Sequence, residues 1–171
     1  MADTLKTLKC PACGEEMEKV FIPSEGINLD ICTKGCGGIF FDNREFKDFD
    51  EKDEDISKIL EKIEGKDFKK VDTSADRFCP NCGAKMVKNH SSVHNTIEVD
   101  DCYGCGGKFL DRDELVKIRA EYDTEEERSE DVLREVYKTV GQELAEVDRK
   151  YAASKVNRTN LQNIFYKIIG Q

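Results

Sequence analysis

The sequence predicts a small α+β fold, in which two tandem three-stranded units are joined by a helical linker and followed by an α-helical C-terminal tail. Three observations predict it. All eight cysteines fall into one pattern that occurs twice, and short strand-like runs lie between and after the cysteine pairs. The chain of 171 residues, without Trp and with 38% hydrophobic against 37% charged residues, is also lean for one large core. Several small units, each stabilised by its own cross-link, are therefore expected.

The cysteine pattern repeats at an offset of 69 residues. The first copy has Cys-Pro-x-Cys-Gly at residues 10–14 and a second pair followed by Gly-Gly at 32–38, and the second copy has the same motifs at 79–83 and 102–107. The second pairs begin 70 residues apart, because the first copy has one extra residue inside its turn. This agreement indicates a tandem duplication. The predicted parts are residues 1–47 and 77–119 for the copies, 48–76 for an acidic linker and 120–171 for the tail.

Each copy is expected to form a hairpin, a third strand and the start of a helix. In the first copy, residues 20–22 and 27–29 flank a turn that contains Pro23 and Gly26, and in the second copy the run 93–99 has strand character. Residues 39–41 and 108–110 read as the third strands. The capping boxes that follow, Asp42 with Glu45 and Asp111 with Glu114, are each expected to begin a helix.

The linker and the tail show helical spacing of apolar residues. In the linker, an acidic run is followed by Ile56, Ile59, Leu60 and Ile63, and Gly65 ends the pattern, so we expect a solvated linker with one amphipathic helix. In the tail, a stripe runs along a first helix at Leu133, Val136, Val140, Leu144, Val147 and Tyr151. We expect residues 157–160 to interrupt it, and a second helix to follow. This stripe needs a partner, such as the two three-stranded units, the tail itself or a second copy of the chain.

Charge and hydropathy restrict the partners. The formal net charge is −9, and only residues 77–119 lack an acidic excess, with seven basic against six acidic side chains. An acidic chain repels phosphate backbones, so only a local nucleic-acid contact on the second copy is expected. The first nine residues have no apolar signal core, and no stretch approaches the ~20 apolar residues of a membrane span. We therefore expect a cytoplasmic protein without membrane contact, whose cysteines bind metal rather than form disulfides.

The spacing of the cysteines is typical of metal sites with four thiolate ligands. Two cysteines separated by two or three residues can direct both sulfurs at one ion, and a second such turn completes a tetrahedron. Pairing within a copy encloses 18 residues between Cys13 and Cys32, whereas pairing across copies encloses 88 between Cys13 and Cys102. The longer loop costs about 1.4 kcal/mol more in closure entropy. The predicted sites are therefore Cys10, Cys13, Cys32 and Cys36, and Cys79, Cys82, Cys102 and Cys105.

Two Zn²⁺ ions per chain are the expected cofactors, because four thiolates close a structural zinc site and leave no position for a catalytic water. Iron, as in rubredoxin-type sites that also use Cys-Pro-x-Cys-Gly turns, is the alternative, and it would make the protein an electron carrier. Each loaded zinc site adds −2, so two sites lower the formal charge from −9 to −13. We also expect the glycines after the cysteines to hold amides near the sulfurs.

Each copy resembles a transcription factor IIB-type zinc ribbon. The matching residues are Cys-Pro-x-Cys-Gly, the later Asp-x-Cys, and Cys-Gly-Gly-x-Phe-(Phe/Leu)-Asp-x-x-Glu, over about residues 8–47 and 77–117. The resemblance implies a three-stranded, rubredoxin-like zinc ribbon. It also implies a role in binding nucleic acid or a partner in the transcription or translation machinery.

No enzyme site and no small-molecule site is evident in the sequence, so two binding functions remain as hypotheses. The first is a regulator that contacts DNA, RNA or a large machine through the second ribbon, where Lys85, Lys88 and His90 are the candidate nucleic-acid contacts. The second is a scaffold that binds a protein partner, or another copy of itself, through residues 124–170. Phe40 and Phe109 could stack on bases, but their place in apolar strands favours packing in a core.

Overall fold

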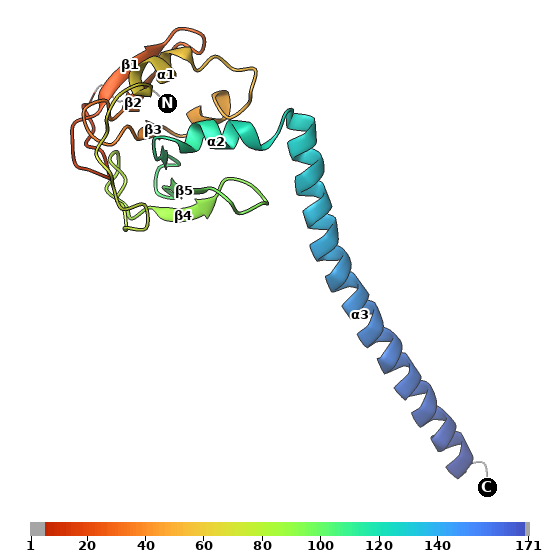
Figure 1. Cartoon of the computed structure of the whole chain (residues 1–171). Coiled ribbons are helices and arrows are strands. Elements are labelled where there is room, and N and C mark those ends of the chain that lie inside the picture. The colour runs from red at the N-terminus through yellow and green to blue at the C-terminus, as the bar shows by residue number, and fades with distance from the viewer. Residues whose placement is uncertain (1–5, 170–171) are drawn as a thin grey trace. The chain divides into compact units, whose positions relative to one another are not determined.

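The computed structural model describes the backbone of residues 6–169 and the side chains of residues 6–153. The chain divides into two compact units, one ending at Arg128 and one beginning at Ser129. In the first unit, each copy of the repeat supplies three antiparallel strands (Figure 1). These are β1 (Glu18–Ile22), β2 (Ile27–Ile31) and β3 (Ile39–Phe41), then β4 (Val87–His90), β5 (Glu98–Asp101) and β6 (Lys108–Leu110). The predicted tandem α+β ribbons are confirmed.

The hairpin of the second copy begins earlier than its sequence predicts. β4 ends at His90, so Val93 lies in the connecting loop and only the end of the predicted run 93–99 is a strand. Polar pairs hold the two strands in register, with Lys88 opposite Asp100 and joined to it by an ion pair of 3.2 Å. Because β4 is mostly polar, the alternation of apolar residues did not reveal it.

The six strands form a single sheet in the order β1-β2-β3-β6-β5-β4. Strand β3 pairs with β6, and in this pair Phe40 stands directly opposite Phe109. These two residues occupy equivalent positions in the repeat. Equivalent residues can face each other in this way only when the two copies are related by an approximate two-fold axis that passes between them. The ribbons therefore associate through their third strands as a symmetric pair within one chain.

The second glycine of each Gly-Gly motif makes this close approach possible. A Cβ atom on Gly38 would lie 2.3 Å from Cζ of Phe109, and a Cβ on Gly107 would lie 2.5 Å from Cζ of Phe40. Each ribbon thus places its aromatic ring against the bare backbone of the other ribbon. This packing buries both rings, which are at most 1% exposed. The prediction that Phe40 and Phe109 pack in a core is therefore confirmed.

The two faces of the sheet carry different cores, as the alternation of side chains along a strand requires. One face packs the linker against the strands, in a cluster that contains Ile39, Phe41 and Leu110. The other face joins all the cysteines of the two quartets except Cys82 in a cluster with Phe40, Phe109, Leu8, Met17 and Met86. Cysteines of the two copies therefore form two separate metal sites but pack in one small hydrophobic core.

The linker contains the predicted helix but is more buried than predicted. Helix α1 (Ser57–Ile63) buries Ile59 and Ile63 in the first core, and the φ angle of Gly65 is +68° just beyond its end. Before it, the 3-10 helix η1 (Glu45–Asp48) is all that forms after the capping box of the first copy, and Phe49 is fully buried. The apolar side chains of the linker cover one face of the sheet, so this segment is part of the fold.

A buried arginine holds the acidic part of the linker. Arg119, in helix α2 (Glu114–Glu121), is 8% exposed and donates hydrogen bonds to the carbonyl oxygens of Phe49, Lys52 and Glu54 at 2.7–3.1 Å. It also contacts the Glu54 carboxylate at 3.3 Å. These bonds satisfy backbone acceptors of a segment that has little regular structure of its own.

A second buried arginine links the strands of the second ribbon. The Arg77 guanidinium pairs with Asp100 at 2.7 Å and with Asp111 at 2.9 Å, and it lies over the Phe109 ring at 4.9 Å. The Asp111 backbone N–H also donates to the Glu114 carboxylate at 2.7 Å, which is one of the two bonds of the predicted capping box. Helix α2 itself begins at Glu114, with Asp113 as its N-cap. The equivalent of Arg77 in the first ribbon is Leu8, which is 1% exposed, so the two copies stabilise the same position differently.

The tail forms one helix, and the predicted division into two helices is wrong. Helix α3 runs from Glu125 to Ile169, through the predicted break at residues 157–160. It begins as expected, because the Thr124 hydroxyl accepts a hydrogen bond from the backbone N–H of Glu127. Asn and Thr inside a helix each cost only a few tenths of a kcal/mol more than a good helix former, and no Pro or Gly stands there. Among the residues described, no helix is long and apolar enough to cross a membrane.

Gly107→Ala and Gly38→Ala are each expected to lower the free energy of unfolding by about 2 kcal/mol or more, because the added methyl group would overlap the opposing ring. Urea unfolding of the zinc-loaded protein measures the loss. The control is Gly141→Ala on α3, where nothing lies within 4 Å of the new methyl group. Equal stability of all three variants would contradict the close contact between the ribbons.

Glu114→Gln is expected to stabilise the protein increasingly as the pH rises. Burial raises the pKa of Glu114 from 4.5 to about 7, so folding is penalised once this group must ionise, and the penalty grows between these two values. Glutamine keeps the acceptor of the capping box without the charge. The difference in unfolding free energy between variant and wild type should therefore increase from pH 5.5 to 8. A difference that does not change with pH would refute the penalty.

Candidate metal centres

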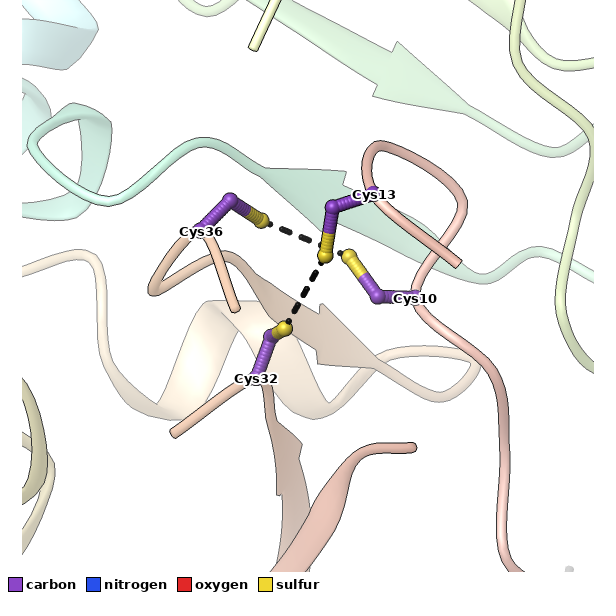
Figure 2. Close-up of side chains that lie close together, drawn as sticks. All are labelled: Cys10, Cys13, Cys32 and Cys36. Carbon is purple, nitrogen blue, oxygen red and sulfur yellow. Dashed lines mark hydrogen bonds between the residues drawn. The ribbon is translucent and has the colours of Figure 1, made fainter. Parts of the chain in front are cut away.

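The first quartet gathers four sulfurs from two turns. Cys10 and Cys13 lie in the turn before β1, and Cys32 and Cys36 lie in the turn between β2 and β3. Their sulfurs converge on one point (Figure 2), with 3.4 Å between those of Cys10 and Cys36 and 3.4 Å between those of Cys13 and Cys32. All four sulfurs lie within 4.8 Å of one another.

The second quartet has the same arrangement. The sulfurs of Cys79 and Cys105 are 3.5 Å apart, and those of Cys82 and Cys102 are 3.4 Å apart. These four also lie within 4.8 Å of one another. The structure therefore brings together all eight predicted cysteines, in the two groups that the loop-closure argument favours, and none of them forms a disulfide.

Each quartet fits a zinc ion. A tetrahedral site with Zn–S bonds of ~2.3 Å has sulfurs about 3.8 Å apart, and the observed separations lie around this value. Four thiolates saturate such an ion, so the arrangement is that of a closed structural site rather than a catalytic one. When bound, zinc would cross-link the two turns of its ribbon.

Backbone geometry places donors beside the sulfurs. The first glycine after each second cysteine of a pair, including Gly37 and Gly106, has φ between +77° and +79°, a conformation that suits glycine. The amide of this glycine bonds to the carbonyl of the first cysteine in its turn, for instance Gly106 to Cys102 at 2.7 Å. The amide of the next glycine points at sulfur instead: Gly107 hydrogen-bonds to Cys105, and Gly38 to Cys36. The expectation that both glycines serve the sulfurs therefore holds directly only for the second.

Without a cation, some of the crowded sulfurs in each quartet retain their protons, whereas hydrogen bonds with neighbouring cysteines lower the pKa of Cys32 and of Cys102. Hydrogen bonds with the sulfurs of Cys32 and Cys36, together with burial, hold the pKa of Cys10 far above its ordinary value. Burial likewise raises the pKa of Cys79 in the second quartet. Four thiolates cannot share so small a volume unless a cation balances their charge, so metal binding must displace protons from these sites.

The two sites differ in their exposure to solvent. In the first, three of the four cysteines are buried, and the turn passes closer to the sulfurs: a Cβ on Gly35 would lie 2.5 Å from the sulfur of Cys13, against 3.3 Å between a Cβ on Gly104 and the sulfur of Cys82. The linker adds a further cover, since the amide of Lys69 donates to the Gly35 carbonyl at 2.9 Å. In the second site Cys82 is exposed and Cys105 is partly exposed. The longer turn of the first copy therefore gives the better protected site.

Two of the three candidate nucleic-acid contacts form ion pairs with nearby acidic side chains. Lys85 forms an ion pair with Asp76 at 2.7 Å, and Lys88 pairs with the buried carboxylate of Asp100. His90 is exposed at the end of β4. Lys88 and His90 thus lie on β4 and Lys85 lies just before it, and both lysines form ion pairs with acidic side chains.

The surfaces of the two ribbons differ in a way that the sequence motifs did not predict. In the second ribbon Phe78, Val87 and Tyr103 are 59%, 42% and 74% exposed. Aligning the two copies, with the one-residue gap in the turn, gives polar equivalents in the first ribbon, namely Lys9, Glu18 and Thr33. Thr33 donates a hydrogen bond to Glu18 at 2.8 Å, which shows that these positions adjoin on a ribbon. Comparing the copies position by position would have revealed this difference.

The second site is expected to lose its metal first. Adding a thiol-modifying reagent stepwise to the zinc-loaded protein should release the first equivalent of zinc as Cys82 reacts, because its sulfur is the most accessible. A zinc-sensitive dye follows the release, and peptide mass spectrometry identifies the modified cysteines, with Cys13 as the matched position in the first copy. Simultaneous loss from both sites, or earlier modification of Cys13, would contradict the difference in protection.

The comparison with protein families agrees with this geometry. A family model described as transcription factor zinc-finger, of the transcription factor IIB zinc-ribbon type, matches residues 9–50 and 78–121, just over half of the chain. No curated protein and no solved structure matches the chain. Both matched segments contain one complete cysteine quartet and its three strands. The chain therefore belongs to the transcription factor zinc-finger family, as two tandem zinc ribbons of the transcription factor IIB type.

Proposed function

We propose that this protein is a non-enzymatic zinc-binding regulator that binds a component of the transcription or translation machinery through its second ribbon. One zinc ion is held by Cys10, Cys13, Cys32 and Cys36, and the other by Cys79, Cys82, Cys102 and Cys105. The closed four-sulfur arrangement supports a structural role for both ions, because it provides no open coordination position for a substrate or water. Membership of the zinc-ribbon family supports zinc rather than iron.

The exposed apolar surface of the second ribbon is the observation that carries the proposal. Phe78, Val87 and Tyr103 stand where the first ribbon has Lys9, Glu18 and Thr33. Both ribbons keep the same fold, so the apolar residues are not needed for folding at these positions. Exposed aromatic side chains are enriched at protein interfaces, where they supply much of the binding energy. We define Phe78, Val87 and Tyr103 as the ribbon-2 surface.

Electrostatics favour a protein over a nucleic acid as the primary partner. The formal charge of −9 falls to −13 with two zinc sites loaded, which opposes bulk attraction to phosphate. Lys85 and Lys88 are neutralised by Asp76 and Asp100. Direct contact with DNA or RNA at Lys85, Lys88 and His90 is the second candidate, favoured because residues 77–119 alone lack an acidic excess and because bases can stack on exposed aromatic rings.

Affinity capture with the zinc-loaded protein from an extract of its own cells tests the proposal, performed with and without nuclease. We expect a protein from the transcription or translation machinery to be retained after nuclease treatment. The variant Phe78→Lys/Val87→Glu/Tyr103→Thr, which gives the second ribbon the residues of the first, should fold and lose this partner. Metal analysis of the same preparation should give two zinc per chain and no iron absorption.

The matched control is Phe21→His, which replaces an exposed apolar residue of the first ribbon by its counterpart His90 and should retain the partner. Equal capture by the triple variant would contradict the ribbon-2 surface as the binding face. Complete loss of the partner on nuclease treatment, together with salt-dependent binding of the purified protein to a DNA or RNA pool, would instead support the second candidate.

A further inference from the structure

Helix α3 carries a row of apolar side chains that are exposed along its described length. Leu133, Val140, Leu144 and Val147 are 44–60% exposed, and Tyr137 and Tyr151 are 73% and 69% exposed. A helix of 45 residues is about 68 Å long. Isolated helices gain little stability in water from propensity alone, and this one also contains a glycine, Gly141. Packing of the apolar row against a partner is what would stabilise it.

The spacing of this row is that of a coiled coil. The residues recur at alternating intervals of four and three, in the order Leu133, Tyr137, Val140, Leu144, Val147 and Tyr151. This alternation corresponds to the d and a positions of a heptad, which meet another helix at a small crossing angle. Val132 and Val136 are also exposed beside the first part of this row, whereas from Val140 to Tyr151 the row carries all the exposed large apolar side chains. This later part is narrower than the broad apolar face with which a helix covers a globular core. The pattern therefore indicates another helix as the partner.

We propose that α3 pairs with α3 of a second copy of this chain, as an antiparallel two-stranded coiled coil centred between Leu144 and Val147. In this alignment Leu144 packs against Val147 of the second copy, and Val140 packs against its Tyr151. The symmetry doubles each contact, which gives four consecutive apolar layers. The inference goes beyond the proposed function of the ribbons and does not depend on their metal or their partner.

The charges beside the apolar row select the antiparallel orientation. In a parallel pair in register, Glu143 at a g position faces Asp148 at the e position of the other helix, and the two negative charges repel. In the antiparallel alignment g positions face each other, so Glu143 lies opposite Lys150 and the pair attracts. By symmetry this attraction occurs twice. The charges of residues 143 and 150 therefore match those of a second copy when the two helices run in opposite directions.

Other occupants of the row fit less well. The continuous helix from Glu125 to Ile169 has no turn that would let the tail fold back as a hairpin. Between residues 129 and 153 six acidic residues outnumber four basic ones, which disfavours adsorption on an anionic lipid surface. A second copy supplies both the heptad row and the complementary charges.

Sedimentation equilibrium of the full-length zinc-loaded protein over a range of concentrations tests the pairing. We expect a monomer–dimer equilibrium, and Leu144→Asp should weaken the dimer about 100-fold or more, since each of the two central layers loses a leucine and gains a charge. The matched control is Gln142→Asp, which adds the same charge at an exposed position outside the row and should leave the dissociation constant within about threefold. Circular dichroism of each variant verifies the helix content.

The orientation is tested by charge reversal. In the antiparallel dimer Glu143→Lys should weaken association by about tenfold, because lysine then faces Lys150, and Glu143→Lys/Lys150→Glu should restore it. In a parallel dimer Glu143→Lys would strengthen association, because lysine would face Asp148. A monomer at all concentrations, a higher oligomer, or a stronger dimer for Glu143→Lys would overturn the proposal. Because these measurements use the purified protein alone, their outcome does not depend on whether the ribbon-2 surface binds a partner.

Discussion

The contact between β3 and β6 is the constraint on which the folded unit depends. Here each ribbon packs a phenylalanine ring against the backbone of a glycine in the other, and Phe40 and Phe109 are paired residues of the two strands across an approximate two-fold axis. Neither ribbon alone could bury its ring. The close approach lets two three-stranded units, each too small for a core of its own, build one six-stranded sheet with a core on both faces.

The metal sites and this contact reinforce each other. Gly38 and Gly107 accept the opposing ring on one side, and their amides hydrogen-bond to the sulfurs of Cys36 and Cys105 on the other. One backbone position thus serves both the sheet and the site. Zinc that fixes the turn also fixes the glycine against which the other ribbon packs. We therefore infer that loss of either ion would disturb both ribbons, even though the two quartets are far apart in sequence.

Local chemistry made some of this structure predictable. The quartets and the third strands follow from residues close together in the chain, and the sequence predicts them correctly. The capping boxes are correct only in part: the backbone-to-glutamate bonds form, but only a 3-10 helix follows the first box. The pairing of the ribbons was not predicted, because Gly38 and Gly107 look like ordinary turn glycines until the opposing ring is seen. The buried ion pairs of Arg77 and the carbonyl contacts of Arg119 depend on partners 23 to 70 residues away, which no local pattern reveals. The break predicted in the tail relied on capping residues whose preferences are too weak to stop a long helix.

The tandem arrangement has a consequence for how surfaces can differ. In a dimer of identical ribbons every substitution appears twice, so a residue that improves binding on one face also alters the other. Within one chain the two ribbons form one sheet, but each is encoded separately, so a substitution in one leaves the other unchanged. Lys9 and Phe78, or Thr33 and Tyr103, can therefore diverge while Phe40 and Phe109 remain matched. The first ribbon, with its better protected site, completes the shared sheet, so the exposed surface of the second ribbon can change without loss of the fold.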